Sequence, residues 1–509
     1  MFDSAIGQSR PVAARLKRSQ EQHNRHQRRL GRQQRRQPRR RSRPPTSVTA
    51  TAGNTTAQVS WTAPANGGSA ITGYTVTSSG GQTATLAGTF TTASVTGLTN
   101  GTAYTFTVTA TNAVGISEAS ASSSAVTPVP VVYVGATFVP LTPTRVLDTR
   151  DGTGASAGQV GADSTVSVQI TGVAGVPVDG VTAVVMNVTA VAPSASGHIT
   201  VYPSGEARPL ASSLNPTAGV TSPNLVVVKL GVAGKVSLYN AVGATHLIAD
   251  IAGYYTDTGT GATFQATTPS RILDTRDGTG APAAQVGSDS TISVQITGVG
   301  GVPVTGVTAV VLNVTAVAPS MSGHITVYPS GEGRPLASNL NPTAGVTDPN
   351  LVVVKVGAGG KVNLYNAVGA AHLLADVAGY FTDAGTGATF QAATPSRILD
   401  TRDGTGVSAA VVGPDSTISL QIAGSGGVPV SGVTAVVLNV TAVAPSQSGH
   451  ITVYPSGQTR PLASNLNPTA GVTAPNLVVV KVGSDGKVNL YNAVGTTHLI
   501  ADVAGYYTD

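Results

Sequence analysis

An internal repeat with a period of 126 residues constrains this chain more than any other feature. Thr137-Phe138 recurs as Thr263-Phe264 and as Thr389-Phe390, with the same spacing each time (263 − 137 and 389 − 263). The blocks LDTRDGTG, GHITVYPSG and PNLVVVK are identical in all three copies. Solenoid units are much shorter, about 20–50 residues. Each copy is therefore predicted to bury its own core, and the short Gly/Thr connectors predict limited contact between copies.

Each copy consists of short runs rich in Val, Ile, Thr and Tyr, separated by Gly and Pro turns. VTAVVMNVTAV and THLIADIAGYY are two runs of the first copy. No amphipathic helical stretch of about 11 residues or more is evident. The pattern predicts an all-β chain in which each copy is an antiparallel β-sandwich of about seven to nine strands, with a small barrel as the alternative. The expected repeats span residues 137–257, 263–383 and 389–509.

Residues 46–128 follow a different pattern. Trp61, the only Trp of the chain, would point inward from a second strand, and residues 71–76 would form a third. In the run LTNGTAYTFTVTATNAVG, Tyr104 stands at the position of a tyrosine corner. The next strand would turn three side chains inward at a period of two: Phe106, Val108 and Ala110. This segment resembles a fibronectin type III domain, which implies a β-sandwich with Trp61 and Tyr104 in structural roles.

The repeats carry a resemblance of their own. They open with R-[VI]-L-D-T-R, contain Y-P-S-G and close with H-L-[IL]-A-D-[VI]-A-G-[YF]-[YF]. These motifs resemble a module of secreted, often surface-associated actinobacterial proteins, where it is joined in tandem to other domains, frequently hydrolase or peptidase parts. The resemblance implies an extracellular or cell-surface location. It supplies no catalytic residues to carry over.

The charge of the chain is divided between two regions. Residues 1–45 hold thirteen Arg and Lys17 against Asp3 and Glu21, a net +12, whereas the other 464 residues hold 15 Lys+Arg against 21 Asp+Glu, a net −6. The basic segment is predicted to be a disordered tail, with non-specific binding of nucleic acid or anionic surfaces as the alternative. A misassigned start codon would explain both this composition and the lack of a visible signal peptide. No apolar run approaches the roughly 18 residues of a membrane span.

The LDTRDGTG block places Asp148 and Arg150 two residues apart, followed by a turn with Asp151. In a module so poor in charge, we expect an ion pair that pins the turn. Calcium is the alternative, although the spacing of an EF-hand loop is not met. The equivalent residues of the other copies are Asp274, Arg276, Asp277, Asp400, Arg402 and Asp403.

His246 and Asp250 lie four residues apart on a predicted strand. They share a face but are separated by about 13 Å, so they cannot pair directly. A second histidine, His198, could meet them across strands. A satisfied, partly buried histidine is favoured over a metal or catalytic site. The equivalent residues are His372, Asp376, His498 and Asp502, with His324 and His450 matching His198.

Other candidates for chemistry are weaker. Glu206 and Glu332 are replaced by Gln458 in the third copy, so an acid is not required there. The chain has no Cys, and neither a G-x-S-x-G elbow nor an H-E-x-x-H motif is present. The three Asn-Val-Thr sequons lie in apolar runs and are predicted to be unglycosylated. Tyrosines could form a platform that stacks on sugars, but strand periodicity favours packing for most of them: Tyr202, Tyr239 and Tyr254.

These observations predict a non-catalytic extracellular spacer or adhesion protein without a required cofactor. Three weak equivalent sites would gain avidity on a polysaccharide or another polymer of the cell envelope. One alternative is an accessory role in secreted polysaccharide degradation. Another is nucleic-acid or anionic-surface binding through the basic tail. The oligomeric state is left open.

Overall fold

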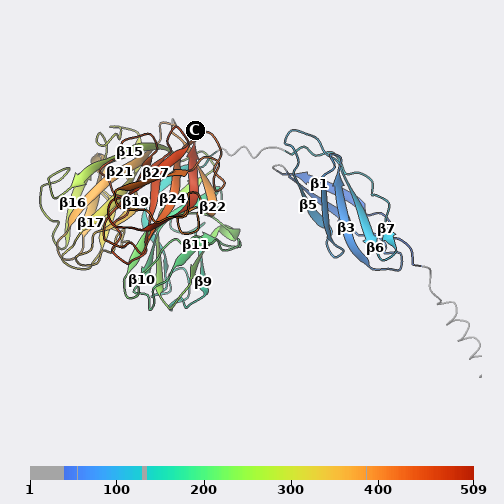
Figure 1. Cartoon of the computed structure of the whole chain (residues 1–509), viewed down its shortest axis with the longest axis horizontal. Helices are drawn as coiled ribbons and strands as arrows, with labels where there is room; N and C mark the ends of the chain where they lie inside the picture. Colours follow the sequence, from blue (N-terminus) through green and yellow to red (C-terminus); the bar gives the residue numbers. More distant parts are fainter. Residues whose placement is uncertain (1–38, 54–55, 129–134, 386) are drawn as a thin grey trace, which may run out of the picture. The chain divides into compact units, whose positions relative to one another are not determined.

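The computed structural model describes residues 39–53, 56–128, 135–385 and 387–509 (Figure 1). The chain divides into two compact units, residues 1–132 and 133–509. Each unit is built from antiparallel β-sheets, which confirms the predicted fold class. Most of the predicted basic tail, residues 1–38, lies outside the described residues.

The N-terminal unit is a sandwich of two sheets. The three-stranded sheet has the order β1 (Thr46–Ala52), β2 (Thr56–Thr62), β5 (Thr92–Thr96). The four-stranded sheet has the order β4 (Thr83–Ala87), β3 (Ile71–Ser78), β6 (Phe106–Asn112), β7 (Gly115–Ile116). Burial alternates strictly along β6, so Phe106, Val108 and Ala110 face the core together with Trp61. The hydroxyl of Tyr104 accepts a hydrogen bond of 3.1 Å from the amide of Thr99.

Two flanking segments pack on this unit. The amides of Arg40 and Arg43 donate to the carbonyls of Gly67 and Ala65, so residues 40–43 contact the sandwich. After β7, three serine hydroxyls spaced three residues apart accept hydrogen bonds from amides of β6: Ser117, Ser120 and Ser123. The edge of the sheet is thereby covered, which protects it from pairing with another chain.

Each repeat is a sandwich of a four-stranded and a three-stranded sheet. In the first repeat the larger sheet has the order β12 (Ser222–Lys229), β10 (Val181–Val191), β14 (His246–Thr256), β8 (Thr137–Asp148). The smaller sheet has the order β11 (Ile199–Pro203), β13 (Lys235–Asn240), β9 (Ser164–Gln169), and a 3-10 turn, η1 (Val232–Gly234), precedes β13.

The same plan recurs in the other two repeats. The second repeat contains β15 (Thr263–Asp274), β16 (Ser290–Gln295), β17 (Val307–Val317), β18 (Ile325–Pro329), β19 (Asp348–Lys355), η2 (Ala358–Gly360), β20 (Lys361–Asn366) and β21 (His372–Thr382). The third contains β22 (Thr389–Asp400), β23 (Ser416–Gln421), β24 (Val433–Val443), β25 (Ile451–Pro455), β26 (Ala474–Lys481), β27 (Lys487–Asn492) and β28 (His498–Thr508).

Each repeat has its own core between its two sheets, as the sequence predicts. In the first repeat this core includes Leu147, Met186, Ile199 and Leu238, which are fully buried. The inward residues come from alternate positions of each strand, since successive side chains of a strand point to opposite faces.

A further core is shared by all three repeats, so the prediction of limited contact between them is wrong. It joins the outer faces of the three larger sheets through Phe138, Phe264, Phe390 and their neighbours. The cause lies in strands such as β10, where both alternating sets of side chains are largely apolar and both faces must therefore be buried. Gly253 permits the close approach at this core, because a Cβ there would lie 2.4 Å from the ring of Phe138.

Backbone bridges close the three repeats into a ring. Phe138 pairs with Ala262 at the start of the second repeat, and Phe264 pairs with Ala388 at the start of the third. Ala136, at the start of the first repeat, pairs with Phe390 of the third. Every connection thus runs from one repeat to the next in cyclic order, which gives the unit an approximate threefold arrangement.

Candidate functional site

The side chains on the outer face of β10 lie along the interface between the first and second repeats, from the shared core to the protein surface. Ala183 and Val185 lie in the shared core. Asn187 follows and bonds to the second repeat, with its side-chain amide 2.6 Å from the carbonyl oxygen of Ser338. Thr189 and Val191 come next and line a groove. Because alternate residues of a strand share one face, the shared core, the polar contact and the groove follow one another along β10.

A closed set of asparagines holds the three interfaces. The side-chain amide of Asn350 donates to the side-chain oxygen of Asn187 over 2.9 Å, and the oxygen of Asn350 accepts from the amide of Leu225. The same pattern links Asn476 to Asn313 and Asn224 to Asn439, both over 3.0 Å. Asn187, Asn313 and Asn439 are the asparagines of the three sequons, and all are buried.

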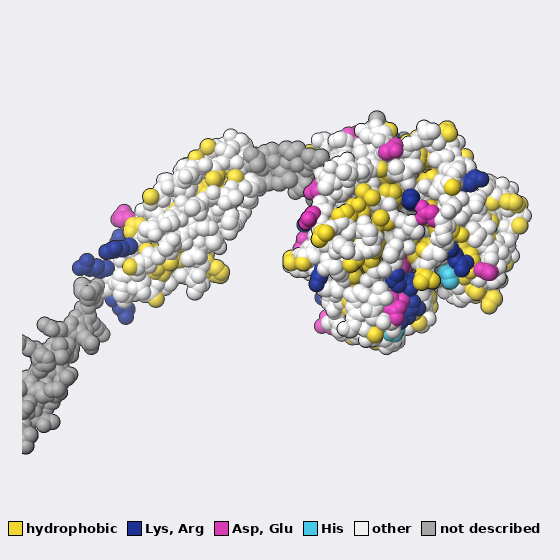
Figure 2. Space-filling model, turned by 180° about the vertical axis from the view of Figure 1, so that it is seen from behind, with side chains coloured by type: hydrophobic (Ala, Val, Ile, Leu, Met, Phe, Trp, Pro, Cys, Tyr) yellow, Lys and Arg dark blue, Asp and Glu magenta, His cyan; other side chains and the backbone are white. Residues whose placement is uncertain are grey.

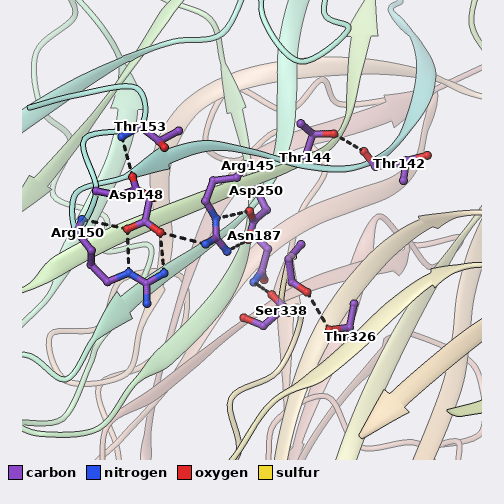
Figure 3. A network of polar contacts seen from close by, with 12 residues as sticks. Thr142, Thr144, Arg145, Asp148, Arg150, Thr153, Asn187, Asp250, Thr326 and Ser338 are labelled. Atoms are coloured by element: carbon purple, nitrogen blue, oxygen red, sulfur yellow. Dashed lines mark hydrogen bonds and ion pairs between the residues drawn. The ribbon is translucent and has the colours of Figure 1, made fainter. Parts of the chain in front are cut away.

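An ion network lies beside this contact at one end of the same sheet (Figure 3). Arg145 of β8 faces Asp250 of β14 in the strand register and bonds both its carboxylate oxygens, over 2.9 and 3.2 Å. Arg145 also reaches Asp148 over 3.0 Å, and Arg150 turns back to bond both oxygens of Asp148 over 2.9 and 2.6 Å. The sequence-predicted pair of Asp148 and Arg150 is thus part of a larger network with Asp250.

Arg145 is the member that sequence reasoning missed. It is the first residue of the R-V-L-D-T-R motif, and its partner lies 105 residues later, so only the pairing of β8 with β14 reveals the contact. The network recurs in the other repeats, with the same bonds among Arg271, Asp274, Arg276 and Asp376, and among Arg397, Asp400, Arg402 and Asp502.

The network sets the charge state of its carboxyls. Hydrogen bonds from Arg150 lower the pKa of Asp148 to about 2, against the opposing effect of burial. Burial raises the pKa of Asp250, and the bond from Arg145 opposes this. Asp151 lies outside the network and accepts a hydrogen bond from the amide of Thr153, as Asp277 and Asp403 do from Thr279 and Thr405. The side chains of Asp148 and Asp250 are each 2% exposed.

The histidines do not join this network. Nδ1 of His246 lies 3.1 Å from the hydroxyl of Thr149, which also accepts a hydrogen bond from the amide of Leu247. His372 and His498 make the same contact with Thr275 and Thr401. His198 instead packs beside Tyr239, with ring centroids 6.1 Å apart. Within the described residues, no group of three or more His, Asp or Glu could hold a metal ion.

The position occupied by Glu206, Glu332 and Gln458 is a contact between repeats. Thr394 donates to Glu206 and Thr268 donates to Gln458, each over 2.9 Å, and Thr142 donates to Glu332. An amide oxygen accepts such a bond as a carboxylate does, which explains why Gln458 is tolerated.

The tyrosines do not offer an open platform for sugars. Tyr239 is 7% exposed because the guanidinium of Arg208 lies 3.6 Å from its ring centre, and its hydroxyl donates to Asp163. Tyr254 is buried as well, and Tyr202 is half-buried. Stacking on a sugar would require these rings to be uncovered first.

The groove between the first and second repeats has a volume of about 580 Å³. Arg145, Arg150 and Thr189 line it from the first repeat, and His324 and Leu336 line it from the second. On the face shown in Figure 2, basic and acidic side chains gather in small mixed groups on a largely uncharged surface. The residues 126 positions further on stand at the other two interfaces, where Asn313 and Asn439 make the contacts that Asn187 makes here.

A smaller cavity of about 130 Å³ lies where all three repeats meet. Equivalent threonines, prolines and asparagines of the three repeats line it. One position breaks the equivalence, because Ser222 and Ala474 correspond to Asp348 in the second repeat. Burial raises the pKa of Asp348 to about 6.

Comparison with known proteins identifies one part of the chain. Residues 43–126 match the fibronectin type III domain family. This segment therefore has both the sequence pattern and the two-sheet fold of that family. No curated protein matches the chain. None of the described residues forms a helix long and apolar enough to cross a membrane.

Solved structures give only weak overall likenesses. Titin kinase with its flanking domains is 18% identical over 26% of this chain and 30% of its own, with a TM-score of 0.16. The FN1–FN3 domains of chicken CNTN1 are 15% identical over 64% of this chain and 99% of their own, with a TM-score of 0.17. A triple jelly-roll protein of an archaeal virus is 9% identical over 72% and 91%, with a TM-score of 0.15. Overlaps this low support no assignment for the repeats.

Proposed function

We propose that the three repeats form a non-catalytic binding head of an extracellular or cell-surface protein, in which each interface between repeats takes a segment of a polymer. The observation that carries the proposal is the groove of about 580 Å³, whose lining residues come from two repeats. Because the repeats are cyclically arranged, the same residue set recurs three times. A polymer with repeated units would engage these sites together and gain avidity that a single site lacks.

The fibronectin type III domain fits such a role as a spacer, since domains of this family are generally non-catalytic modules. Within the ion network of each repeat the charges are paired, as Asp148 and Asp250 are with Arg145. This supports a structural use of the ion network and a binding use of the groove beside it.

The test is co-sedimentation of the full chain with insoluble polysaccharides and with actinobacterial cell wall, in calcium and in EDTA. A groove variant replaces the exposed leucine of each interface: Leu210→Ala, Leu336→Ala and Leu462→Ala. These side chains are 94%, 93% and 96% exposed, so their truncation should not affect folding. The matched control is Val178→Ala, Val304→Ala and Val430→Ala, which are also exposed and outside the groove.

Saturable binding that the groove variant weakens and the control variant retains is the expected result. Equal binding by both variants would place the ligand elsewhere and contradict the proposal. Failure of every polymer to retain the protein would leave the repeats as a passive spacer.

A further inference from the structure

The groove between repeats presents hydrogen-bond donors and no acid. Its charged lining residues are Arg145 and Arg150, whereas burial lowers the pKa of His324 and favours the neutral ring. None of the described lining residues carries a carboxylate. The two acids of the network, Asp148 and Asp250, lie behind the arginines with side chains 2% exposed. A ligand in the groove therefore meets cationic and neutral donors first, although the network as a whole is balanced in charge.

Arg150 has donor capacity to spare. Its Nε and Nη2 bond Asp148, whereas Nη1 makes no hydrogen bond within the described part of the chain. The side chain is 48% exposed, so that Nη1 can reach a ligand without loss of the ion pair. A hydrogen bond from a charged guanidinium to an oxyanion is about twice as strong as one between neutral groups.

Thr189 provides an independent sign of a missing partner. It is 2% exposed, lines the groove, and its hydroxyl has no hydrogen-bond partner among the described residues. The equivalent hydroxyl of Thr441 is unpartnered as well. A buried hydroxyl without a partner costs about 1–3 kcal/mol, and an oxyanion that reaches Thr189 or Thr441 would supply the missing bond.

Leu336 adds an apolar contact at the rim. It is 93% exposed and lines the groove from the second repeat, and its equivalents Leu210 and Leu462 are exposed to the same degree. An almost fully exposed leucine beside a donor-rich groove suits a ligand that joins an apolar surface, such as the face of a sugar ring, to an acidic group.

We propose that the grooves bind an acidic polymer through its oxyanions, with Arg150 and Thr189 as donors and Leu336 as the apolar contact. This deepens the proposed function, on which it rests. Carboxylates of a uronic-acid polymer and phosphates of a polyol-phosphate polymer share this chemistry. The threefold recurrence places the corresponding donors at Arg276 and Arg402.

The first test is a charge series at the exposed rim of the full chain. Leu210, Leu336 and Leu462 are replaced together by Glu or by Lys, and binding is measured to polygalacturonate, to poly(glycerol phosphate) and to neutral dextran. The Glu variant should weaken binding of an acidic polymer about tenfold because like charges then face each other, and the Lys variant should strengthen it. Dextran separates this result from binding of neutral sugar.

The control replaces Val178, Val304 and Val430 by Glu, which changes the net charge equally outside the groove. We expect it to alter binding by less than about twofold at physiological salt, where distant exposed charges are screened. Equal losses in the rim and control variants would assign the binding to overall charge, including the basic N-terminal segment, and overturn the proposal. Preference between polygalacturonate and poly(glycerol phosphate) identifies which oxyanion the groove takes.

The second test is Thr189→Val combined with Thr441→Val. Removal of unpartnered buried hydroxyls should raise the melting temperature, while the affinity for the acidic polymer should fall severalfold. Unchanged affinity would remove Thr189 from the site. If neutral dextran binds and the rim charges have no effect, the acidic ligand is wrong while the binding head stands; if no polymer binds, the proposed function itself fails.

Discussion

The side-chain amide of Asn350 donates a hydrogen bond of 2.9 Å to the side-chain oxygen of Asn187, which lies 163 residues earlier in another repeat. Both residues are buried, with exposures of 2% and 3%. The bond is one of three equivalents that close a cycle through all repeats. The same amide of Asn350 also donates to the carbonyl of Asn339 in its own repeat. Interface formation and folding are therefore coupled in this unit, because a repeat alone would keep that bond and lose the bond to the neighbouring repeat.

The first prediction concerns this cycle. Asn187→Ala removes the hydrogen bond that Asn187 accepts from the amide of Asn350 and the one that it donates to the carbonyl of Ser338, so the free energy of unfolding should fall by about 2–3 kcal/mol. Urea titration followed by tyrosine fluorescence measures the change. Asn363→Ala is the matched control, because within the described residues the side chain of Asn363 makes a single hydrogen bond, an exposed one from Ser293. An equal fall in the free energy of unfolding in both variants would show that the buried asparagine cycle stabilises the protein no more than an exposed hydrogen bond does.

The second prediction concerns calcium. Asp148→Ala removes the shared partner of Arg145 and Arg150 and leaves two guanidinium groups without it, at a cost of about 3 kcal/mol. Because the carboxylate is already held by arginines, the loss should be the same in calcium and in EDTA. Differential scanning calorimetry in both buffers checks this. A loss that appears only in calcium would instead indicate a cation site at the turn.

The third prediction is a fall in stability in acid. The pKa of Asp148 is lowered in the folded protein to about 2, and those of Asp274 and Asp400 are lowered as well. Their contribution is therefore fully present above the unfolded pKa of about 4 and is lost as the pH falls toward 2. Urea midpoints between pH 5 and pH 2 should decrease, and Asp148→Asn should flatten that decrease. If the urea midpoint of Asp148→Asn depends on pH as steeply as that of the wild type, Asp148 is not the source of the acid sensitivity.

The fourth prediction concerns Asp348, which lines the smaller cavity where the three repeats meet. Its raised pKa of about 6 means that the folded state favours the protonated carboxyl, so stability is present below about pH 4 and is lost as the pH rises through 6. Asp348→Ser introduces the residue of the first repeat, Ser222, and should stabilise the protein at pH 7. The group is half-buried, and we expect a screened gain of about 1–2 kcal/mol.

The comparison between two pH values decides this case. At pH 4 the gain from Asp348→Ser should vanish, since the wild-type carboxyl is then largely protonated in the folded state. Asp348→Ala, which introduces the residue of the third repeat, should behave in the same way. A gain of equal size at pH 4 and pH 7 would mean that the charge is not its origin.

The fifth prediction concerns the oligomeric state of a single repeat. Residues 261–383 alone would expose the outer face of the larger sheet, including Val311 and Phe381 of the shared core. Three copies can bury this face in the way that the three linked repeats do, so we expect a trimer by light scattering. Val311→Asp places a charge on that face and should yield a monomer. A stable wild-type monomer would contradict the inference that the shared core is required.

Local pattern predicted much of the fold but little of the assembly. The alternation of Phe106, Val108 and Ala110 specifies one buried face, and β6 buries that face as predicted. In VTAVVMNVTAV both faces are apolar, which indicates a strand covered on both sides. The pattern does not specify what buries the second face. A further sheet of the same repeat and a neighbouring repeat would both require an apolar face there.

The candidate site was predictable only in part for the same reason. The pairing of Asp148 with Arg150 is local in sequence, and the structure places the two residues in contact. The bond from Arg145 to Asp250 depends on strand register, and the groove depends on which repeats are neighbours. Such relationships are properties of the assembled ring, so no spacing within one copy could specify them.

The bridge between Ala136 and Phe390 has a mechanical consequence. It consists of two backbone hydrogen bonds of 2.9 and 2.8 Å, and it joins the start of the first repeat to the third. Tension applied to the backbone just before Ala136 would therefore load the third repeat as well as the first. Force on a polymer bound at any of the three interfaces would therefore be distributed over the closed ring. In a chain of repeats joined only end to end, the least stable repeat would limit the force that the protein withstands.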